Sequence, residues 1–219
     1  MPKTKVVEVG ATLRGQCWGF MIGSTLFAVG SAPVVSGWLG TTGANISFFV
    51  GAWFFTIAAF IQLGLSGPAT VTGSSRPLAV RALWLSAATQ FVGTLLFNVS
   101  TSAALHATSI TAVKEYVWGP DADGSAAFLI SSGFAVLVLF RQKQMWAPRS
   151  RDWLSTWIGT LGSVAFGVSA VGSIITPAGT AQDVTLASWG TFIGALCFFA
   201  AAALLLEPRQ PAAAAVAPT

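Results

Sequence analysis

The stretch NISFFVGAWFFTIAAFIQLGL, residues 45–65, runs without a single charged side chain. About 20 apolar residues are enough for a helix to cross the hydrocarbon core of a bilayer. Five further stretches qualify or come close: residues 16–38, 83–105, 124–140, 153–175 and 186–206. The stretch 124–140 is the shortest, and the aliphatic stem of Arg141 can extend it toward the interface. The sequence therefore predicts an all-α integral membrane protein with six transmembrane helices.

Composition excludes most soluble classes of protein. Of the 219 residues, 54% are hydrophobic and only 8% are charged, and the mean hydropathy is +0.72. Soluble domains contain roughly 25% charged residues. The net charge of +4 does not predict nucleic-acid binding, because basic residues at helix ends meet anionic lipid headgroups. The apolar run 16–38 is longer than a signal-peptide core, so we expect a retained helix.

Basic residues predict the orientation, since cytoplasmic loops collect Lys and Arg. With a cytoplasmic N-terminus, ten basic residues fall inside: Lys3, Lys5, Arg14, Arg76, Arg81, Arg141, Lys143, Arg149, Arg151 and Arg209. Only Lys114 falls outside. The asymmetry predicts a multi-pass protein of the cell (inner or plasma) membrane with both termini in the cytoplasm.

The predicted helices divide the chain into seven segments. They are a cytoplasmic segment (1–15), a first hairpin (16–65), a cytoplasmic linker (66–82), a second hairpin (83–140), a basic cytoplasmic loop (141–152), a third hairpin (153–207) and a disordered tail (208–219). The Gly/Pro/Ser/Thr-rich part of the linker and the low-complexity tail are expected to be mobile. The outer loop, residues 106–125, could lie flat on the membrane, with its helical pattern broken at Gly119 and Pro120.

An internal repeat relates the hairpins. The odd-numbered helices contain IGSTLFAVGSAP from Ile22, VGTLLFNVSTSA from Val92 and LGSVAFGVSAVG from Leu161, which share the pattern G-[ST]-x-x-F-x-V. The even-numbered helices contain FVGAWFF from Phe49, LISSGFA from Leu129 and FIGALCF from Phe192, which align Gly51, Ser131 and Gly194. The chain is therefore predicted to hold three parallel copies of one hairpin, unlike the inverted repeats of many transporters.

Small residues recur four positions before most of the repeat glycines, and Gly19-x-x-x-Gly23 and Gly190-x-x-x-Gly194 are complete GxxxG motifs. Such strips let helices approach closely in lipid. They could bind a partner subunit, but packing within each hairpin is favoured because the motif recurs in helices that must pack internally. The predicted helix-packing residues are Gly19, Gly23, Phe27, Gly51, Gly93, Phe97, Gly162, Phe166, Gly190 and Gly194.

The most polar stripe lies on the third predicted helix. Its members follow helical spacing along one face: Gln90, Thr94, Asn98 and Thr101. They could line a hydrated pocket or the polar end of a lipid site. The favoured alternative is that they form hydrogen bonds to neighbouring helices, because an unsatisfied polar group in hydrocarbon costs several kcal/mol.

Residues for catalysis are sparse. The predicted spans carry no Asp, Glu, Lys or Arg near their middle, which argues against a proton relay. His106 has no companion ligands or nucleophile motif, and Cys17 and Cys197 are interpreted as packing residues. The fragment D-A-D-G, residues 121–124, is interpreted as a turn in which Asp123 or Ser125 caps the fourth helix. We therefore expect that the protein is not an enzyme and that it binds neither a metal ion nor a cofactor.

The first and third hairpins resemble the YrhK domain of bacterial membrane proteins. The resemblance rests on FFVGAWFFTIAAFIQ in the first copy and TFIGALCFFAAAALLLEP in the third, each preceded by a G-S-x-x-F-x-V helix. The middle copy departs from it at Ser131 and Ser132. The resemblance implies a small membrane domain without established catalytic residues. Multi-repeat members are typical of actinobacteria, where accessory subunits of Mce-type lipid importers are one setting.

Two functional hypotheses follow. The first is a non-enzymatic accessory or scaffolding subunit of a larger membrane complex, for example a lipid-import system, whose partners are other membrane subunits. The alternative is an autonomous binder or carrier of a lipid or other apolar ligand, with the helix-three stripe at its polar end. Neither nucleic acid nor a soluble substrate is expected.

Overall fold

The computed structural model describes residues 3–70 and 80–206, and within these ranges the chain is helical apart from its connections. The long helices of the described chain are α1 (Lys3–Ser31), α2 (Pro33–Leu65), α3 (Ala82–Ala104), α5 (Gly119–Arg141), α6 (Arg151–Gly172) and α7 (Val184–Leu206). Two short elements, α4 (Ile110–Ala112) and the π-helix η1 (Val113–Trp118), precede α5. Much of the predicted mobile linker and the predicted disordered tail lie outside the described residues.

Five helical segments in the described ranges are long and apolar enough to cross a membrane. They are α2, α3, the continuous segment Ile110–Arg141, α6 and α7. The chain is thus a multi-pass membrane protein. Helix α1, which carries Lys3, Lys5, Glu8 and Arg14 in its first half, is not one of these five.

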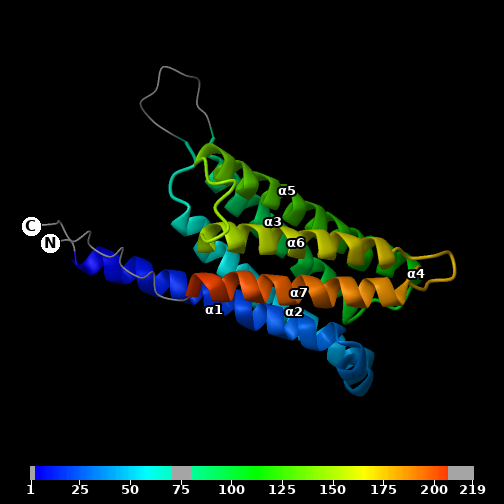
Figure 1. Ribbon diagram of the computed structural model, residues 1–219. Coiled ribbons are helices and arrows are strands. Elements are labelled where there is room, and N and C mark those ends of the chain that lie inside the picture. Colours follow the sequence, from blue (N-terminus) through cyan, green and yellow to red (C-terminus); the bar gives the residue numbers. More distant parts are fainter. Residues whose placement is uncertain (1–2, 71–79, 207–219) are drawn as a thin grey trace, which may run out of the picture.

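The six long helices of the described chain form a closed ring, called the helix ring below (Figure 1). Helices α1 and α2, α3 and α5, and α6 and α7 pair as antiparallel hairpins. Contacts of α2 with α3, of α5 with α6 and of α7 with α1 close the ring. Helix α1 begins and α7 ends at the same end of the bundle. Each helix therefore has one neighbour in its hairpin and one in the next, and all share a central axis.

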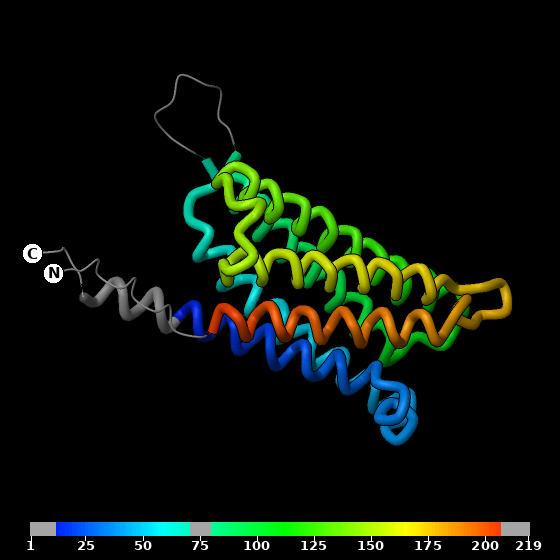
Figure 2. Tube along the Cα trace, viewed as in Figure 1, coloured from blue at the N-terminus to red at the C-terminus, as the bar shows by residue number. Residues whose placement is uncertain are grey.

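The first predicted helix, residues 16–38, has the wrong boundaries. Helix α1 already begins at Lys3, inside the predicted segment 1–15, and it ends at Ser31. Ala32 is extended (φ −62°, ψ 122°) because the ring of Pro33 disfavours the helical conformation in the residue before it. Helix α2 starts at Pro33, and its first turns bend away from the rest at Gly40 (φ 65°); Figure 2 shows them nearly end-on, projecting to the side of the bundle. The predicted helices 83–105, 153–175 and 186–206 agree with α3, α6 and α7 to within three residues.

The predicted outer loop and the short fourth helix are also corrected. One continuous helical segment, Ile110–Arg141, replaces the flat loop and the helix 124–140. It passes through Pro120, which has no N–H and would clash with a carbonyl one turn earlier in a regular helix. The π-helical turns Val113–Trp118 directly before it relieve this conflict by widening the helix, as seen where Gly119 N–H bonds the carbonyl of Lys114. Neither Asp123 nor Ser125 caps a helix; Ser109 does so at the start of α4.

A reciprocal glycine contact recurs in all three hairpins. The pairs are Gly23 with Gly51, Gly93 with Gly124, and Gly162 with Gly194. A Cβ atom placed on the first member of each pair would lie 2.9, 3.0 or 3.2 Å from the carbonyl oxygen of the second, and one placed on the second would lie 3.1 Å from that of the first. Side chains at these crossings would push the helices apart, so glycine permits the close approach.

This contact corrects the alignment of the middle copy. Gly124, rather than Ser131, occupies the position of Gly51 and Gly194. Ser131 lies seven residues further along α5, where its hydroxyl donates to the carbonyl of Ser86 (2.8 Å) and the hydroxyl of Ser86 donates to that of Ser131 (3.0 Å). The helix crossing requires a residue without a side chain, which Gly124 provides. The apolar run LISSGFA matches the other even-numbered helices in hydropathy only, so it does not predict the position of the crossing.

Candidate functional site

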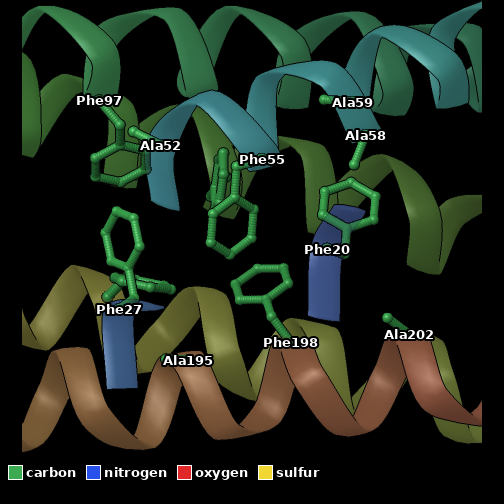
Figure 3. Packing of buried hydrophobic residues seen from close by; sticks show 12 residues of the cluster. Phe20, Phe27, Ala52, Phe55, Ala58, Ala59, Phe97, Ala195, Phe198 and Ala202 are labelled. Carbon is green, nitrogen blue, oxygen red and sulfur yellow. The ribbon is translucent and has the colours of Figure 1, made fainter. Parts of the chain in front are cut away.

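A cluster of phenylalanines fills the middle of the helix ring. In each helix a Phe follows the pairing glycine by four residues and so lies on the same face. The six form what is called the phenylalanine plug: Phe27, Phe55, Phe97, Phe128, Phe166 and Phe198. Their side chains are at most 9% exposed, and neighbouring rings meet mostly edge to face with centroids 5.1–6.3 Å apart. Figure 3 shows Phe27, Phe55, Phe97 and Phe198 turned toward one another between the helices.

The predicted helix-packing residues lie either in the plug or in contacts inside a hairpin. Besides the three glycine pairs, Gly19 of α1 faces Ala58 of α2, and Gly190 of α7 faces Ala165 and Ser169 of α6. The GxxxG strips are therefore covered by the chain itself. A partner subunit would have to bind another surface.

The two ends of the bundle differ in charge. The basic end, where α1 begins, holds Arg81, Arg141, Lys143, Arg149 and Arg151 together with Asp152. The acidic end holds Glu115, Asp121, Asp123 and Asp183 together with Lys114. One cavity lies between the basic end and the plug, and a second lies between the acidic end and the plug.

The basic-end cavity has a volume of about 270 Å³ and is lined by residues from every member of the helix ring. Phe20, Phe128 and Phe198 form its apolar floor. Its polar wall includes Gln16, Gln62, Ser86, Gln90, Ser131, Ser132, Ser155, Thr156, Thr160 and Ser163. Several of these are tied across helices: Gln62 Nε2 donates to Gln90 Oε1 (3.2 Å), and Ser155 donates to the carbonyl of Ala201 (3.0 Å).

The acidic-end cavity has a volume of about 250 Å³ and also receives residues from every member of the ring. Phe27 and Phe166 of the plug separate it from the other cavity. Its polar wall comprises Asn45, Ser100, Thr101, Asp121, Ser169, Ser173 and Thr191. Trp118, the last residue of the π-helical turns, lines the same cavity, and its indole N–H donates to the carbonyl of Ala170 (3.0 Å), which joins η1 to α6.

Some residues of the helix-three stripe form hydrogen bonds to a neighbouring helix, as the favoured interpretation predicts, and some line a cavity. Gln90 bonds Gln62, and Asn98 Nδ2 donates to the hydroxyl of Thr56 (2.8 Å), so both connect α3 to α2. Thr94 and Thr101 instead donate to carbonyls of their own helix, at 2.7 Å in both cases. Gln90 lines the basic-end cavity and Thr101 the acidic-end cavity, so the stripe borders both without forming one pocket.

Other residues of these cavities were not singled out from the sequence. Gly124 and Phe128 repeat the pattern G-x-x-x-F that the remaining five long helices of the described chain also contain. This pattern could have identified both residues from the sequence. The prediction of a turn at Asp121 is wrong, because Asp121 lies in α5 and lines a cavity. Asp123, two residues on, is exposed, so the two carboxylates of the D-A-D-G fragment do not line one site. Within residues 3–70 and 80–206, no cluster of His, Cys, Asp and Glu could hold a metal ion.

Comparison of the chain with known proteins found no relative. No protein-family model matches the chain, and neither a curated protein nor a solved structure matches it. The resemblance to the YrhK domain therefore stays a prediction.

Proposed function

We propose that all six long helices of the described chain cross the membrane and that the helix ring carries a small polar solute along its own axis. The observation that supports this proposal most is that a cavity, the phenylalanine plug and a second cavity follow one another along the axis of the ring. On each side of the phenylalanine plug lies a cavity whose wall mixes apolar side chains with hydroxyl and amide groups, and every member of the ring contributes to both cavities.

The orientation follows from charge. Helix α1 falls short of the hydropathy of the other five, but it lies in the ring between α2 and α7 and must share their environment. The basic end faces the cytoplasm, since Lys and Arg concentrate in cytoplasmic loops. Both termini are then cytoplasmic, and the acidic-end cavity opens outside the cell.

The distribution of polarity supports a path inside the protein. Large apolar side chains such as Ile57, Phe60 and Leu161, each more than half exposed, cover the outside of the ring. Hydroxyl and amide groups gather on the inside instead. Cavities of 250–270 Å³ are too small for a lipid and suit a solute of a few heavy atoms, because drug-sized ligands occupy about 300–1,000 Å³.

The plug acts as the gate. A polar solute between phenylalanine rings loses its hydrogen bonds, at a cost of roughly 2–7 kcal/mol for each unsatisfied group. With ring centroids 5.1–6.3 Å apart, the solute passes only when rings rotate or helices separate. The resting state is therefore closed.

The accessory-subunit hypothesis and the Mce setting stay predictions that rest on the sequence and the YrhK resemblance. The glycine strips on which a partner was expected are occupied inside the hairpins. The apolar-ligand alternative would require a ligand of a few heavy atoms, because cavities of 250–270 Å³ are too small for a lipid, and such a ligand would leave the hydroxyl and amide groups of the walls without partners.

Flux in proteoliposomes tests the proposal. The full chain is reconstituted and the entry of urea, glycerol, K⁺ and methylammonium is followed by stopped-flow light scattering. Substituting Phe128→Ala or Phe55→Ala opens the plug, so flux of at least one solute rises severalfold over the wild type. The matched control is Phe60→Ala on α2, whose side chain is 65% exposed to lipid, and it should leave flux unchanged. Flux no greater than that of empty liposomes for the wild type and both plug variants would overturn the proposal.

A further inference from the structure

One position breaks the threefold pattern inside the acidic-end cavity. Asp121 lies three residues before Gly124, and the same place in the other hairpins holds Phe48 and Thr191. All three side chains line the cavity. Only the middle hairpin contributes a carboxylate there, so this charge is not a requirement of the repeated fold.

The Asp121 carboxylate has no hydrogen bond or ion pair to any described residue. Nor does a Lys, Arg or His among the described residues line the cavity. A carboxylate that is partly buried and has no cationic partner loses solvation without compensation. A cation that entered the cavity would restore this compensation.

Several neighbouring side chains present oxygen atoms to the cavity. Asn45 donates its Nδ2 to the carbonyl of Ala104 (2.9 Å), Thr101 donates to that of Phe97 (2.7 Å) and Ser169 donates to that of Ala187 (2.7 Å). Thr191 lies 2.7 Å from the Ser169 hydroxyl, whose proton is already committed, so Thr191 is the donor of that bond. The three hydroxyl protons are used in the protein, and the hydroxyl oxygens together with Asn45 Oδ1 keep lone pairs that can coordinate a ligand.

Two further features favour a positive ligand. The acidic end carries Glu115, Asp121, Asp123 and Asp183 against Lys114, a net charge of 1 − 4 = −3 that attracts cations. The indole of Trp118 lies in the cavity wall, and its bond to Ala170 holds it there. A tryptophan ring stabilises a cation further where the cation lies within about 6 Å of the ring face.

We propose that the acidic-end cavity binds a small monovalent cation, held by the Asp121 carboxylate and the surrounding oxygens. The shared chemistry is a single positive charge with oxygen coordination, which a hard metal ion such as K⁺ or Na⁺ and a small ammonium such as methylammonium both satisfy. This inference rests on the proposed function in that it names the solute, but cation binding is measurable without transport.

The test uses the full chain in lipid nanodiscs. NaCl, KCl and methylammonium chloride are titrated separately at constant ionic strength, maintained with the bulky cation N-methyl-D-glucamine. Binding is read from tryptophan fluorescence and from the unfolding temperature. We expect saturable changes in both with at least one of the three salts. Saturation with methylammonium alone identifies an amine site, and saturation with Na⁺ or K⁺ alone a metal-ion site.

The variant Asp121→Asn keeps the shape of the side chain and removes its charge, and it should weaken binding at least about tenfold. Asp123→Asn is the matched control, because it removes the same charge from an exposed side chain of the same helix, and its affinity should stay within about twofold. No saturable change with any salt, or equal losses in the two variants, would overturn the inference. Flux of urea or glycerol without cation binding refutes the inference alone, and cation binding without flux of any solute refutes the proposed function alone.

Discussion

A close helix contact at Gly190 in the third hairpin predicts that adding a methyl group there lowers the stability. A Cβ atom on Gly190 of α7 would lie 2.7 Å from the backbone nitrogen of Ser169 and 2.8 Å from the carbonyl oxygen of Ala165 in α6. These atoms belong to the backbone of a helix and cannot rotate away. Gly190→Ala therefore forces α6 and α7 apart by several tenths of an ångström, which also stretches the 2.7 Å bond from Ser169 to the carbonyl of Ala187.

The loss of stability caused by Gly190→Ala is best measured against a matched variant, Gly133→Ala. Gly133 of α5 has no atom within 4 Å of its would-be Cβ, so Gly133→Ala adds a methyl group without a clash. Both substitutions gain about 1 kcal/mol of helix propensity, so their difference isolates the overpacking, about 1–3 kcal/mol. At about 2–4 °C per kcal/mol for a chain of this size, Gly190→Ala should melt about 2–12 °C below Gly133→Ala.

Thermal unfolding in one detergent, followed by circular dichroism, measures this difference. The two variants and the wild type are compared at equal protein and detergent concentrations. Equal melting temperatures for the two variants, or a higher one for Gly190→Ala, would refute the close packing of α6 against α7.

Two further predictions concern hydrogen bonds between helices. Asn98→Leu removes the bond to Thr56 between α3 and α2 and should destabilise by only about 0.6–1.7 kcal/mol, as is usual for such bonds in membranes, so a denaturant titration that finds a loss above 3 kcal/mol would contradict the assignment. Ser86→Ala and Ser131→Ala remove the two halves of one reciprocal contact, so a double-mutant cycle should find a coupling energy of at least about 0.5 kcal/mol, and strictly additive losses would contradict it.

Hydropathy in the sequence was enough to predict an all-helical membrane protein, because a span needs only length and apolar composition. The motif G-[ST]-x-x-F-x-V holds the glycine and the phenylalanine that α1, α3 and α6 contribute to the hairpin contacts, whereas the partner of Gly93 is Gly124 and not the predicted Ser131. The end of α1 at Ser31 was within reach of the sequence, because Pro33 restricts the residue before it. The apolar character of residues 34–38 by itself predicts a helix that continues past this proline to Trp38.

The long segment Ile110–Arg141 was beyond sequence reasoning. Gly119 and Pro120 normally end a helix, and only the π-helical turns Val113–Trp118, which depend on packing against α3 and α5, allow it to continue. This continuation brings Asp121 from a supposed surface turn into the acidic-end cavity. The cavities themselves arise from contacts among all members of the ring, and no local pattern encodes them.

Cysteine accessibility tests the central claim that two polar cavities open on opposite sides of the phenylalanine plug. With Cys17 and Cys197 replaced by Ala, single cysteines are placed at Thr191 in the acidic-end cavity, at Ser155 in the basic-end cavity and at Ile130, which is 55% exposed on the outside of the ring. A cationic, membrane-impermeant thiol reagent should modify Thr191→Cys only from outside the cell and Ser155→Cys only from the cytoplasmic side, and it should leave Ile130→Cys unmodified from either side. Modification of both cavity positions from the same side, or of neither from any side, would contradict the account.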